Sequence, residues 1–343
     1  MLFCENFVRV LYIIYIMTLS FEQCSSLVEE QISRMTACDK VPAGLYEPMN
    51  YVLSAGGKRV RPTLALMACN VFVNNVEEAL MPAVALEVFH NFTLLHDDLM
   101  DNADFRRNRP TVHKRWNNNT AILSGDAMMI TAYQYLCRAK SGILPELLET
   151  FTRTALEVCE GQQYDLDFEC RSDVSIDQYI SMIRLKTAAL MAACLKMGAI
   201  CGGASSVNCE SLYRFGISLG LIFQIQDDWL DVYADPVVFG KATGGDILCA
   251  KKTFLLITAL EKADEKTRRK LIELLNDKSV AAAEKINEVK NIYDRLEVGK
   301  EARREINRHH AEAMSHLSRT IVPDKSRKAE LELFAEIMLK REK

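Results

Sequence analysis

The spacing of hydrophobic residues along this 343-residue chain is helical over almost its whole length. Apolar side chains recur at intervals of three and four residues, which places them on one face of an α-helix. Gly and Pro, which interrupt helices, number only 15 and 8. No convincing stretch alternates between apolar and polar residues as a half-buried strand would. The pattern predicts helices over residues 19–36, 43–55, 61–73, 77–101, 119–138, 143–168, 176–201, 208–233, 252–262, 266–274, 279–299, 300–318 and 326–341.

No linker rich in Ser, Gly or Pro divides these segments, so we expect a single all-α domain of about a dozen helices. The apolar run Phe7–Leu19 is too short to span a bilayer, and Arg9 interrupts it. It also lacks the basic lead-in and the cleavage site of a signal peptide. We therefore expect Met17 to be the native start, with residues 1–16 as upstream translation or a disordered segment, a domain over 17–343, and no stable membrane insertion.

Composition narrows the function only slightly. Hydrophobic residues make up 49% of the chain and charged residues 26%, which suits a globular protein. The net charge of −4 gives no support to nucleic-acid binding. The 11 cysteines are scattered and form no CxxC pair, so reduced thiols and a cytoplasmic location are expected.

One acidic motif, DDxxD, occurs twice, each time inside an apolar helical pattern. A spacing of four residues places the first and last carboxylates of each motif on one helix face, about one turn apart. Such neighbours repel each other unless a cation neutralises them, and Mg²⁺ commonly joins carboxylates to substrate phosphates. A single copy would be read as a solvated acidic patch, whereas two copies in apolar surroundings predict a metal site. The motif residues are Asp97, Asp98 and Asp101, then Asp227, Asp228 and Asp231.

Polar residues extend both motifs along their helices. His90 and Thr93 fall on the same stripe as Asp97 and Asp101, and Gln224 lies one turn before the second motif. We expect the two acidic groups to face each other across an apolar cleft, with metal at its mouth.

Basic residues that suit phosphate groups stand in three places. The segment AGGKRVRP carries them after a glycine pair that lets the backbone approach an anion. The segment FRRNRP follows the first acidic motif, and arginine side chains match diphosphate oxygens in pairs. Isolated lysines complete the set, although a lone lysine is usually only solvated. The basic residues are Lys58, Arg59, Arg61, Arg106, Arg107, Lys186, Lys241 and Lys251.

Taken together, these motifs resemble the trans-isoprenyl diphosphate synthases. The segments GGKRVRP, HDDLMD followed by RR, GQQYDLD, LKT, FQIQDDWLD and FGKATGGD followed by KKTF occur in the order seen in that family. The resemblance covers roughly residues 20–343 and points to a short-chain member of the farnesyl or geranylgeranyl diphosphate synthase kind. It implies an all-helical isoprenoid synthase fold around a central apolar cavity, usually a homodimer.

The resemblance also implies the reaction and the roles of residues. Isopentenyl diphosphate would join head-to-tail to an allylic diphosphate, with about three Mg²⁺ ions per active site. The implied metal ligands are the six aspartates of the two motifs and Asp165, which has Gln162 beside it. The implied catalytic residues are Asp97, Asp98, Asp101, Arg106, Lys186, Thr187, Gln224, Asp227 and Lys241. The implied substrate-binding residues are Lys58, Arg61, His90, Arg106, Arg107, Lys186, Thr187, Gln224, Lys241 and Lys251.

In this family, residues just before the first motif form a floor that limits product length. Here they are Phe92 and Thr93. Helical geometry points Phe92 away from Asp97 and brings Phe89 nearer the acidic stripe, so the floor assignment follows from the resemblance alone. One small residue beside one aromatic favours a twenty-carbon product, with fifteen carbons next.

The chain departs from the family at Ala250, where Asn is common, and around Asp246, where an apparent extra residue leaves a metal-linked role open. Three alternatives remain. A class I terpene cyclase also uses DDxxD, but it lacks GGKRVRP and usually has a different second metal motif. A head-to-head squalene- or phytoene-type synthase has differently spaced acidic motifs. A non-catalytic regulatory subunit typically loses one aspartate motif, and both are intact here.

Overall fold

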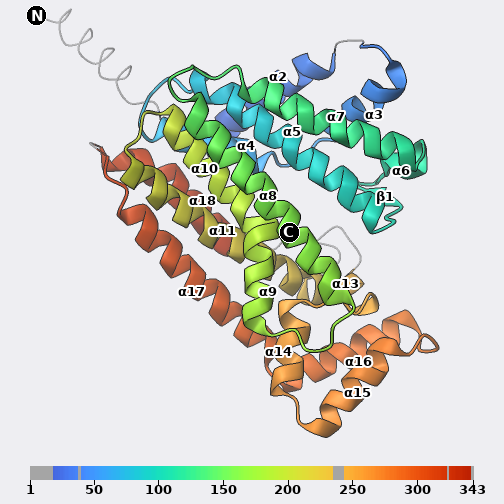
Figure 1. Cartoon of the computed structure of the whole chain (residues 1–343). Coiled ribbons are helices and arrows are strands. Elements are labelled where there is room, and N and C mark those ends of the chain that lie inside the picture. The colour runs from blue at the N-terminus through green and yellow to red at the C-terminus, as the bar shows by residue number, and fades with distance from the viewer. Residues whose placement is uncertain (1–17, 38–39, 235–242, 323, 341–343) are drawn as a thin grey trace, which may run out of the picture. The chain divides into compact units, whose positions relative to one another are not determined.

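The computed structural model describes residues 18–37, 40–234, 243–322 and 324–340, and they form an all-α fold (Figure 1). The all-α prediction is confirmed. The chain divides into two compact units, each built from separate stretches of sequence. Unit 1 comprises residues 1–152, 193–212 and 320–331, and unit 2 comprises 153–192, 213–319 and 332–343. Residues 1–16 and Lys241, on which two predictions fall, lie outside the described residues.

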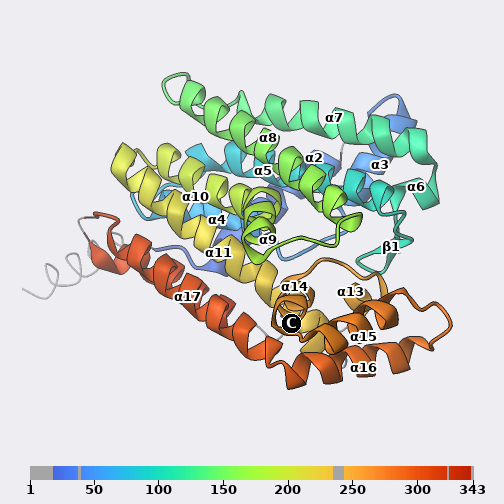
Figure 2. The same cartoon turned by 60° about the horizontal axis from the view of Figure 1, so that its bottom comes forward.

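Unit 1 is built around α5, whose residues from Ala79 to Phe89 are almost all buried. Helices α5 and α7 lie side by side, and Figures 1 and 2 agree on this arrangement. Gly125 permits this approach, because a Cβ atom there would lie 2.1 Å from Nε2 of His96. The elements of unit 1 are α2 (Phe21–Thr36), α3 (Ala43–Leu53), α4 (Val60–Asn70), α5 (Glu77–Met100), β1 (Phe105–Arg106), β2 (Arg109–Pro110), α6 (Val112–Arg115), α7 (Asn118–Leu136) and the 3₁₀ turn η2 (Lys325–Lys328).

Unit 2 contains the second acidic motif on α11 and a group of amphipathic helices. Helices α15 and α16 pack against each other, as do α14 and α17 (Figure 2). The elements of unit 2 are α9 (Ile176–Ile183), the π-helical turn η1 (Arg184–Ala188), α13 (Gly245–Leu248), α14 (Phe254–Lys262), α15 (Glu265–Asn276), α16 (Ala282–Arg295) and α17 (Val298–Ser318). Helices that contribute residues to both units are α8 (Leu144–Glu169), α10 (Ala189–Cys201), α11 (Ser206–Tyr233) and α18 (Ala329–Leu339).

Most predicted helices agree with the observed ones to within a few residues, because their ends carry local signals. Ser20, for example, forms a capping box with Gln23 at the start of α2. The segment predicted as one helix over 176–201 differs, since the π-helical turn η1 interrupts it. The sequence contains no Gly or Pro at this turn to announce it. A packing contact accompanies the turn, because a Cβ atom at Gly161 of α8 would lie 2.3 Å from the backbone nitrogen of Lys186.

A short hairpin after α5 was also not predicted. Strands β1 and β2 pair antiparallel with Arg106 opposite Arg109, so Arg107 and Asn108 form a two-residue turn. Both turn residues have positive φ, 51° and 60°, as a type I′ turn requires. Two-residue strands are too short to produce an alternating pattern, so no periodic signal predicts them.

None of the helices in the described part of the chain combines the length and apolar character needed to cross a membrane.

Ala250 adopts a left-handed backbone conformation, with φ of 50°, directly before Lys251. Asn tolerates this conformation better than Ala, so Ala250→Asn is expected to raise the free energy of unfolding by about 0.5–1 kcal/mol. Urea unfolding measures the change. The control is Ala263→Asn, at a position with φ of −71°, which should bring no gain. Equal stability of Ala250→Asn and the parent chain would contradict the expected strain.

Candidate active site

The first acidic group lies at the carboxyl end of α5. Asp97 and Asp98 belong to its last turn, and Asp101 is the C-cap residue. A helix C-terminus carries a partial negative charge, which adds to the repulsion among three nearby carboxylates. This arrangement is unfavourable unless cations stand close by.

Arg106 supplies one such cation from strand β1. Its Nε donates to Oδ1 of Asp98 at 2.7 Å, and its NH2 group lies 3.7 Å from Oδ2 of Asp97. Burial nevertheless raises the pKa of Asp98 to about 6, because Asp98 is only 6% exposed and the attraction of Arg106 does not fully offset the desolvation. A further cation at this helix end would therefore favour the ionised form.

The type I′ turn directs two arginines from consecutive positions to different partners. Arg106 binds the acidic group, whereas Arg107 donates from its NH1 group to the carbonyl oxygen of Gly56. Gly57 makes room for this contact, because a Cβ atom there would lie 2.9 Å from the guanidinium carbon of Arg107. Gly56 and Gly57 have φ of 74° and 134°, so this loop conformation also suits only glycine well.

His90 of α5 contacts the second arginine of the GGKRVRP segment. NH1 of Arg61 lies 3.1 Å from Nε2 of His90. Burial and the neighbouring arginines hold the pKa of His90 well below its usual value, so the imidazole is neutral. Arg61 can only donate, so Nε2 accepts and the ring proton resides on Nδ1. Nε of Arg61 is buried and has no hydrogen-bond partner among the described residues, a donor that suits an anionic ligand.

In unit 2, Asp228 of the second acidic motif is held by three donors. The hydroxyl of Tyr179 donates to Oδ2 at 2.5 Å, the backbone N–H of Phe254 donates to Oδ2 at 3.0 Å, and Nε2 of Gln224 donates to Oδ1 at 3.1 Å. Burial still raises the pKa of Asp228 to about 6. Gln224 in turn accepts from the hydroxyl of Thr187 at 3.0 Å. Four side chains thus form one connected network.

Asp231 anchors the turn that leads into α13. Its Oδ2 accepts from the backbone N–H of Asp246 at 3.0 Å, and its backbone carbonyl oxygen accepts from the N–H of Gly244 at 2.6 Å. Burial raises the pKa of Asp246 to about 7, with the nearby Asp228 and Asp231 carboxylates adding to the shift. The last aspartate of the motif therefore brings a further, partly buried carboxyl group close to the second acidic group.

The π-helical turn carries Lys186 and Thr187, two predicted substrate-binding residues. Nζ of Lys186 donates to Oδ2 of Asp165 on α8 at 2.5 Å. Thr187 is buried and faces Gln224, as described above. A π-helical turn within an α-helix often marks a functional site, because it displaces side chains from their regular helical positions.

The predicted floor residues belong to an aromatic cluster within unit 1. The ring of Phe89 lies 5.6 Å from Phe92 and 5.3 Å from Phe151. Phe92 also contacts His96, with ring centres 4.8 Å apart, and Tyr133 contacts Phe151 at 5.0 Å. The hydroxyl of Thr93 bonds back to the carbonyl of His90. Phe151 of α8 and Tyr133 of α7 were not singled out from the sequence, because they stand far from the acidic motif along the chain.

The donor chemistry of both acidic groups suits Mg²⁺. Every candidate ligand is a carboxylate oxygen, the kind of ligand that Mg²⁺ prefers. Across the described residues, no three His, Cys, Asp or Glu side chains converge into a complete metal site. Mg²⁺ commonly keeps several waters and joins one or two carboxylates to substrate phosphates, so carboxylate groups of this kind are sufficient protein ligands for it.

The structure groups the predicted residues by unit. It adds Glu87 and Tyr179, which the sequence did not single out, because Glu87 binds Arg59 and Tyr179 binds Asp228 across long distances in sequence. Unit 1 holds Lys58, Arg61, Phe89, His90, Phe92, Thr93, Asp97, Asp98, Asp101, Arg106 and Arg107. Unit 2 holds Asp165, Lys186, Thr187, Gln224, Asp227, Asp228, Asp231 and Lys251.

Comparisons with known proteins agree with this chemistry. The family model described as polyprenyl synthetase matches residues 42–295. A protein of Methanothermobacter thermautotrophicus named short chain isoprenyl diphosphate synthase is 40% identical over 268 residues, which cover 77% of this chain and 82% of that protein. A geranylgeranyl diphosphate synthase of Methanosarcina mazei is 40% identical over 69% of this chain and 74% of its own length. A crystal structure of a geranylgeranyl pyrophosphate synthase matches with a TM-score of 0.89 and 40% identity, covering 95% of this chain and 100% of that one.

Proposed function

Because the chain belongs to the polyprenyl synthetase family and is therefore a prenyltransferase, we propose that it joins isopentenyl diphosphate head-to-tail to allylic diphosphates. The product is a short all-trans prenyl diphosphate, with twenty carbons favoured and fifteen next. One observation carries this proposal. NH1 of Arg61 is hydrogen-bonded to the neutral His90, and the buried Nε of Arg61 can donate to an anion. Both residues belong to the same unit as the first acidic group. A second, diphosphate-bearing substrate explains this basic group, and a terpene cyclase has no need of it.

The proposed chemistry divides between two diphosphates. Breaking the allylic C–O bond leaves an allylic cation and a departing diphosphate. The double bond of isopentenyl diphosphate attacks the cation, and the departing diphosphate takes the proton that is then lost. Mg²⁺, when bound, supplies positive charge that stabilises the departing diphosphate.

The residues of the chain bind and orient the two substrates. Lys58, Arg61, His90 and Arg107 bind the diphosphate of isopentenyl diphosphate. Fixed cations of this kind need no reorganisation during the reaction, which is the source of their effect on rate. The residues that bind the allylic diphosphate are Arg106, Lys186, Lys241 and Lys251, and those near the reacting carbons are Thr187 and Gln224.

We propose about three Mg²⁺ ions per active site, bound by carboxylates of the two acidic motifs and by Asp165. Asp97, Asp98, Asp101 and Asp227 are the proposed principal ligands. The metal contacts of Asp228 and Asp231 stay predictions, because both carboxylates already accept several hydrogen bonds within the protein. A cytoplasmic location likewise stays a prediction, based on the scattered cysteines.

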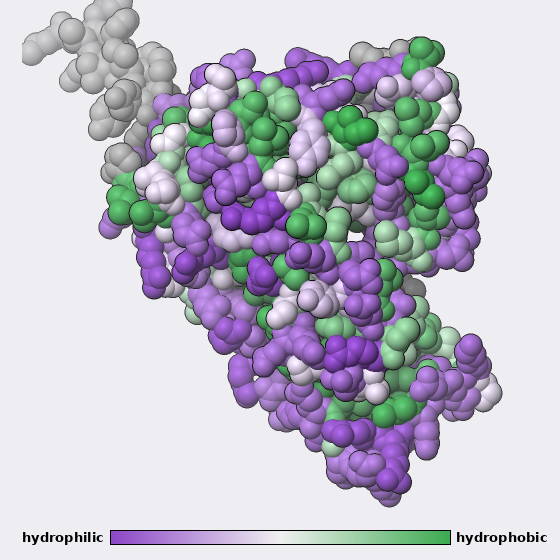
Figure 3. Space-filling view, viewed as in Figure 1, coloured by the Kyte–Doolittle hydropathy of each residue, from purple (hydrophilic) through white to green (hydrophobic). Residues whose placement is uncertain are grey.

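We also propose a homodimer, as is usual in this family. Helix α7 exposes large apolar side chains in unit 1, with Ile122 45%, Leu123 61% and Ile130 61% exposed. Figure 3 shows hydrophobic groups among hydrophilic ones over the region of α6 and α7. A second copy of the chain covering α7 would remove these side chains from water.

The function is tested by incubating the purified chain with labelled isopentenyl diphosphate, each allylic primer and Mg²⁺, then sizing the products by chromatography. We expect linear products, mainly of twenty carbons, and no turnover after chelation of divalent ions. Asp97→Asn should lower kcat about 100-fold or more. The control Asp104→Asn, at a surface carboxylate paired with Lys114, should retain activity. Cyclic products from an allylic diphosphate alone would indicate a terpene cyclase, and an inactive pure chain would indicate a regulatory subunit.

Phe92→Ala should lengthen the product, because removing the ring opens space beside Phe89 and His96. Phe89→Ala serves as the comparison, since Phe89 is only 1% exposed and also contacts Phe151. Chromatography of the chain products measures both. Longer products from Phe89→Ala alone would transfer the floor role to Phe89, and unchanged products from both variants would remove it from this cluster.

Leu123→Glu should convert the dimer to a monomer, because it places a charge in the proposed interface. Size-exclusion chromatography with light scattering gives the mass. The matched control is Ile272→Glu on α15, where the apolar side chain is 42% exposed outside the proposed interface. A wild-type chain with the mass of one copy would contradict the homodimer, and a dimeric Leu123→Glu would place the interface elsewhere.

A further inference from the structure

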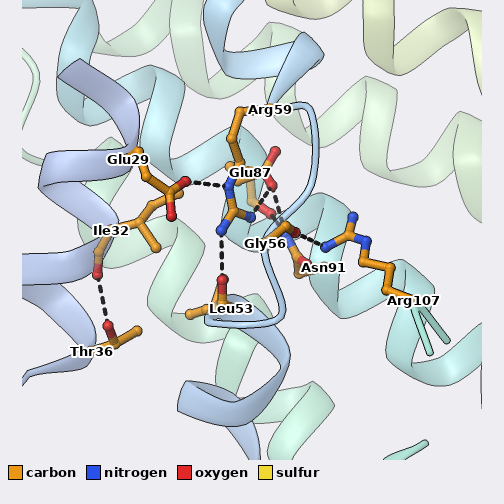
Figure 4. Close-up of polar contacts among 9 residues, drawn as sticks. All are labelled: Glu29, Ile32, Thr36, Leu53, Gly56, Arg59, Glu87, Asn91 and Arg107. Carbon is orange, nitrogen blue, oxygen red and sulfur yellow. Dashed lines mark hydrogen bonds and ion pairs between the residues drawn. The ribbon is translucent and has the colours of Figure 1, made fainter. Parts of the chain in front are cut away.

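Arg59, the middle basic residue of GGKRVRP, lies in a different environment from the basic residues on either side of it. Lys58 is exposed, whereas the side chain of Arg59 is only 1% exposed. Figure 4 shows the guanidinium group of Arg59 among Glu29, Glu87 and Leu53. Three charged residues that look equivalent in the sequence therefore have different environments.

Every nitrogen of the Arg59 guanidinium group is bound within the protein. Nε donates to Glu29 of α2 at 2.8 Å, NH1 to Glu87 of α5 at 2.7 Å, and NH2 to the carbonyl oxygen of Leu53 in α3 at 2.6 Å. Glu87 is 3% exposed and also accepts from Asn91 at 2.9 Å. The positive charge of Arg59 is thus neutralised by carboxylates and is not available to a diphosphate.

The backbone of Arg59 is fixed in a conformation that it would not choose alone. Its φ is 46°, in the left-handed region, and it stands immediately before α4 without a side-chain cap. This conformation is unfavourable for a residue with a side chain, because the Cβ atom lies too close to a neighbouring carbonyl oxygen. The three side-chain bonds offset that cost and determine the direction in which the chain enters α4.

Arg59 and Arg61 each connect the GGKRVRP segment to helix α5. Glu87 binds Arg59, and His90, three residues further along α5, binds Arg61. The carbonyl of Gly56, on the other side of Lys58, is held by Arg107. The diphosphate-binding residues therefore alternate with anchoring contacts along one short segment.

We propose that Arg59 is a positioning residue, which Glu87 and Glu29 hold in place so that Lys58 and Arg61 are oriented for the diphosphate of the non-allylic substrate. The proposal rests on the proposed function, since it assigns that diphosphate to this loop. Arg59 itself does not touch the substrate. A loop less firmly anchored would bind isopentenyl diphosphate more weakly and leave the allylic diphosphate unaffected.

The first test removes both buried charges together, because removing one partner alone would leave a buried charge unpaired and could unfold the chain. In the double variant Arg59→Met with Glu87→Gln, Met keeps an unbranched apolar stem, and Gln keeps the length of Glu and leaves an acceptor for Asn91. The KM for isopentenyl diphosphate is expected to rise about tenfold, with the KM for the allylic substrate changed less than about twofold. An unchanged KM for isopentenyl diphosphate would overturn the proposal, as would an equal rise in both KM values.

The second test avoids the buried pair. Glu29 is 49% exposed, so Glu29→Gln loosens Arg59 without leaving Glu87 alone. We expect a rise of about threefold in the KM for isopentenyl diphosphate only. The matched control is Glu30→Gln, the next residue of α2, which pairs with Arg34 on the surface and should change neither KM. If the double variant fails to fold, the comparison of Glu29→Gln with Glu30→Gln tests the proposal alone. Identical kinetics for these two variants would overturn it.

Failure of the proposed function can be recognised separately. If the wild-type chain does not consume isopentenyl diphosphate, calorimetry with inorganic diphosphate replaces the KM measurement. The positioning role then predicts weaker binding of inorganic diphosphate by Glu29→Gln than by Glu30→Gln. Equal affinities would overturn the role of Arg59, whatever the reaction of the enzyme is.

Discussion

The burial of carboxylates among apolar side chains is the constraint on which the rest of this structure depends. Asp98 and Asp228 are nearly inaccessible to water, and burial raises the pKa of both to about 6. A folded chain tolerates such groups only if donors or cations compensate them. Each unit compensates its buried carboxylate with a different kind of donor.

In unit 1 a partly exposed arginine compensates the buried carboxylate, and in unit 2 a network of neutral donors does so. Arg106 lies on a two-residue strand and is 37% exposed, so it remains accessible to a phosphate. Asp228, by contrast, is held by a tyrosine hydroxyl, a main-chain N–H and a glutamine amide. The carboxylate of Asp228 is therefore held by several buried donors, whereas that of Asp98 is paired with a side chain that reaches the surface.

The helical architecture could be predicted from the sequence because its causes are local. Apolar periodicity and caps such as Ser20 define most helix ends. The π-helical turn at Arg184–Ala188 could not be predicted, since it coincides with the packing of Gly161 against a backbone distant in sequence. The hairpin around Arg107 and Asn108 could not be predicted for a different reason, because two-residue strands carry no periodic pattern.

The candidate site was predictable as a set of residue types and less so as a set of roles. The family resemblance assigned Lys58 and Arg61 to substrate and left Arg59 without a role, but only the structure shows that Arg59 is paired inside the protein while Arg61 contacts a neutral imidazole. The distinction follows from Glu87 and His90 lying three residues apart on α5, so that each faces one of the two arginines. A buried carboxylate neutralises the charge of Arg59, whereas Arg61 meets an uncharged imidazole at 3.1 Å. The spacing of two residues on one helix thus gives one of two identical side chains a charged partner and the other a neutral one.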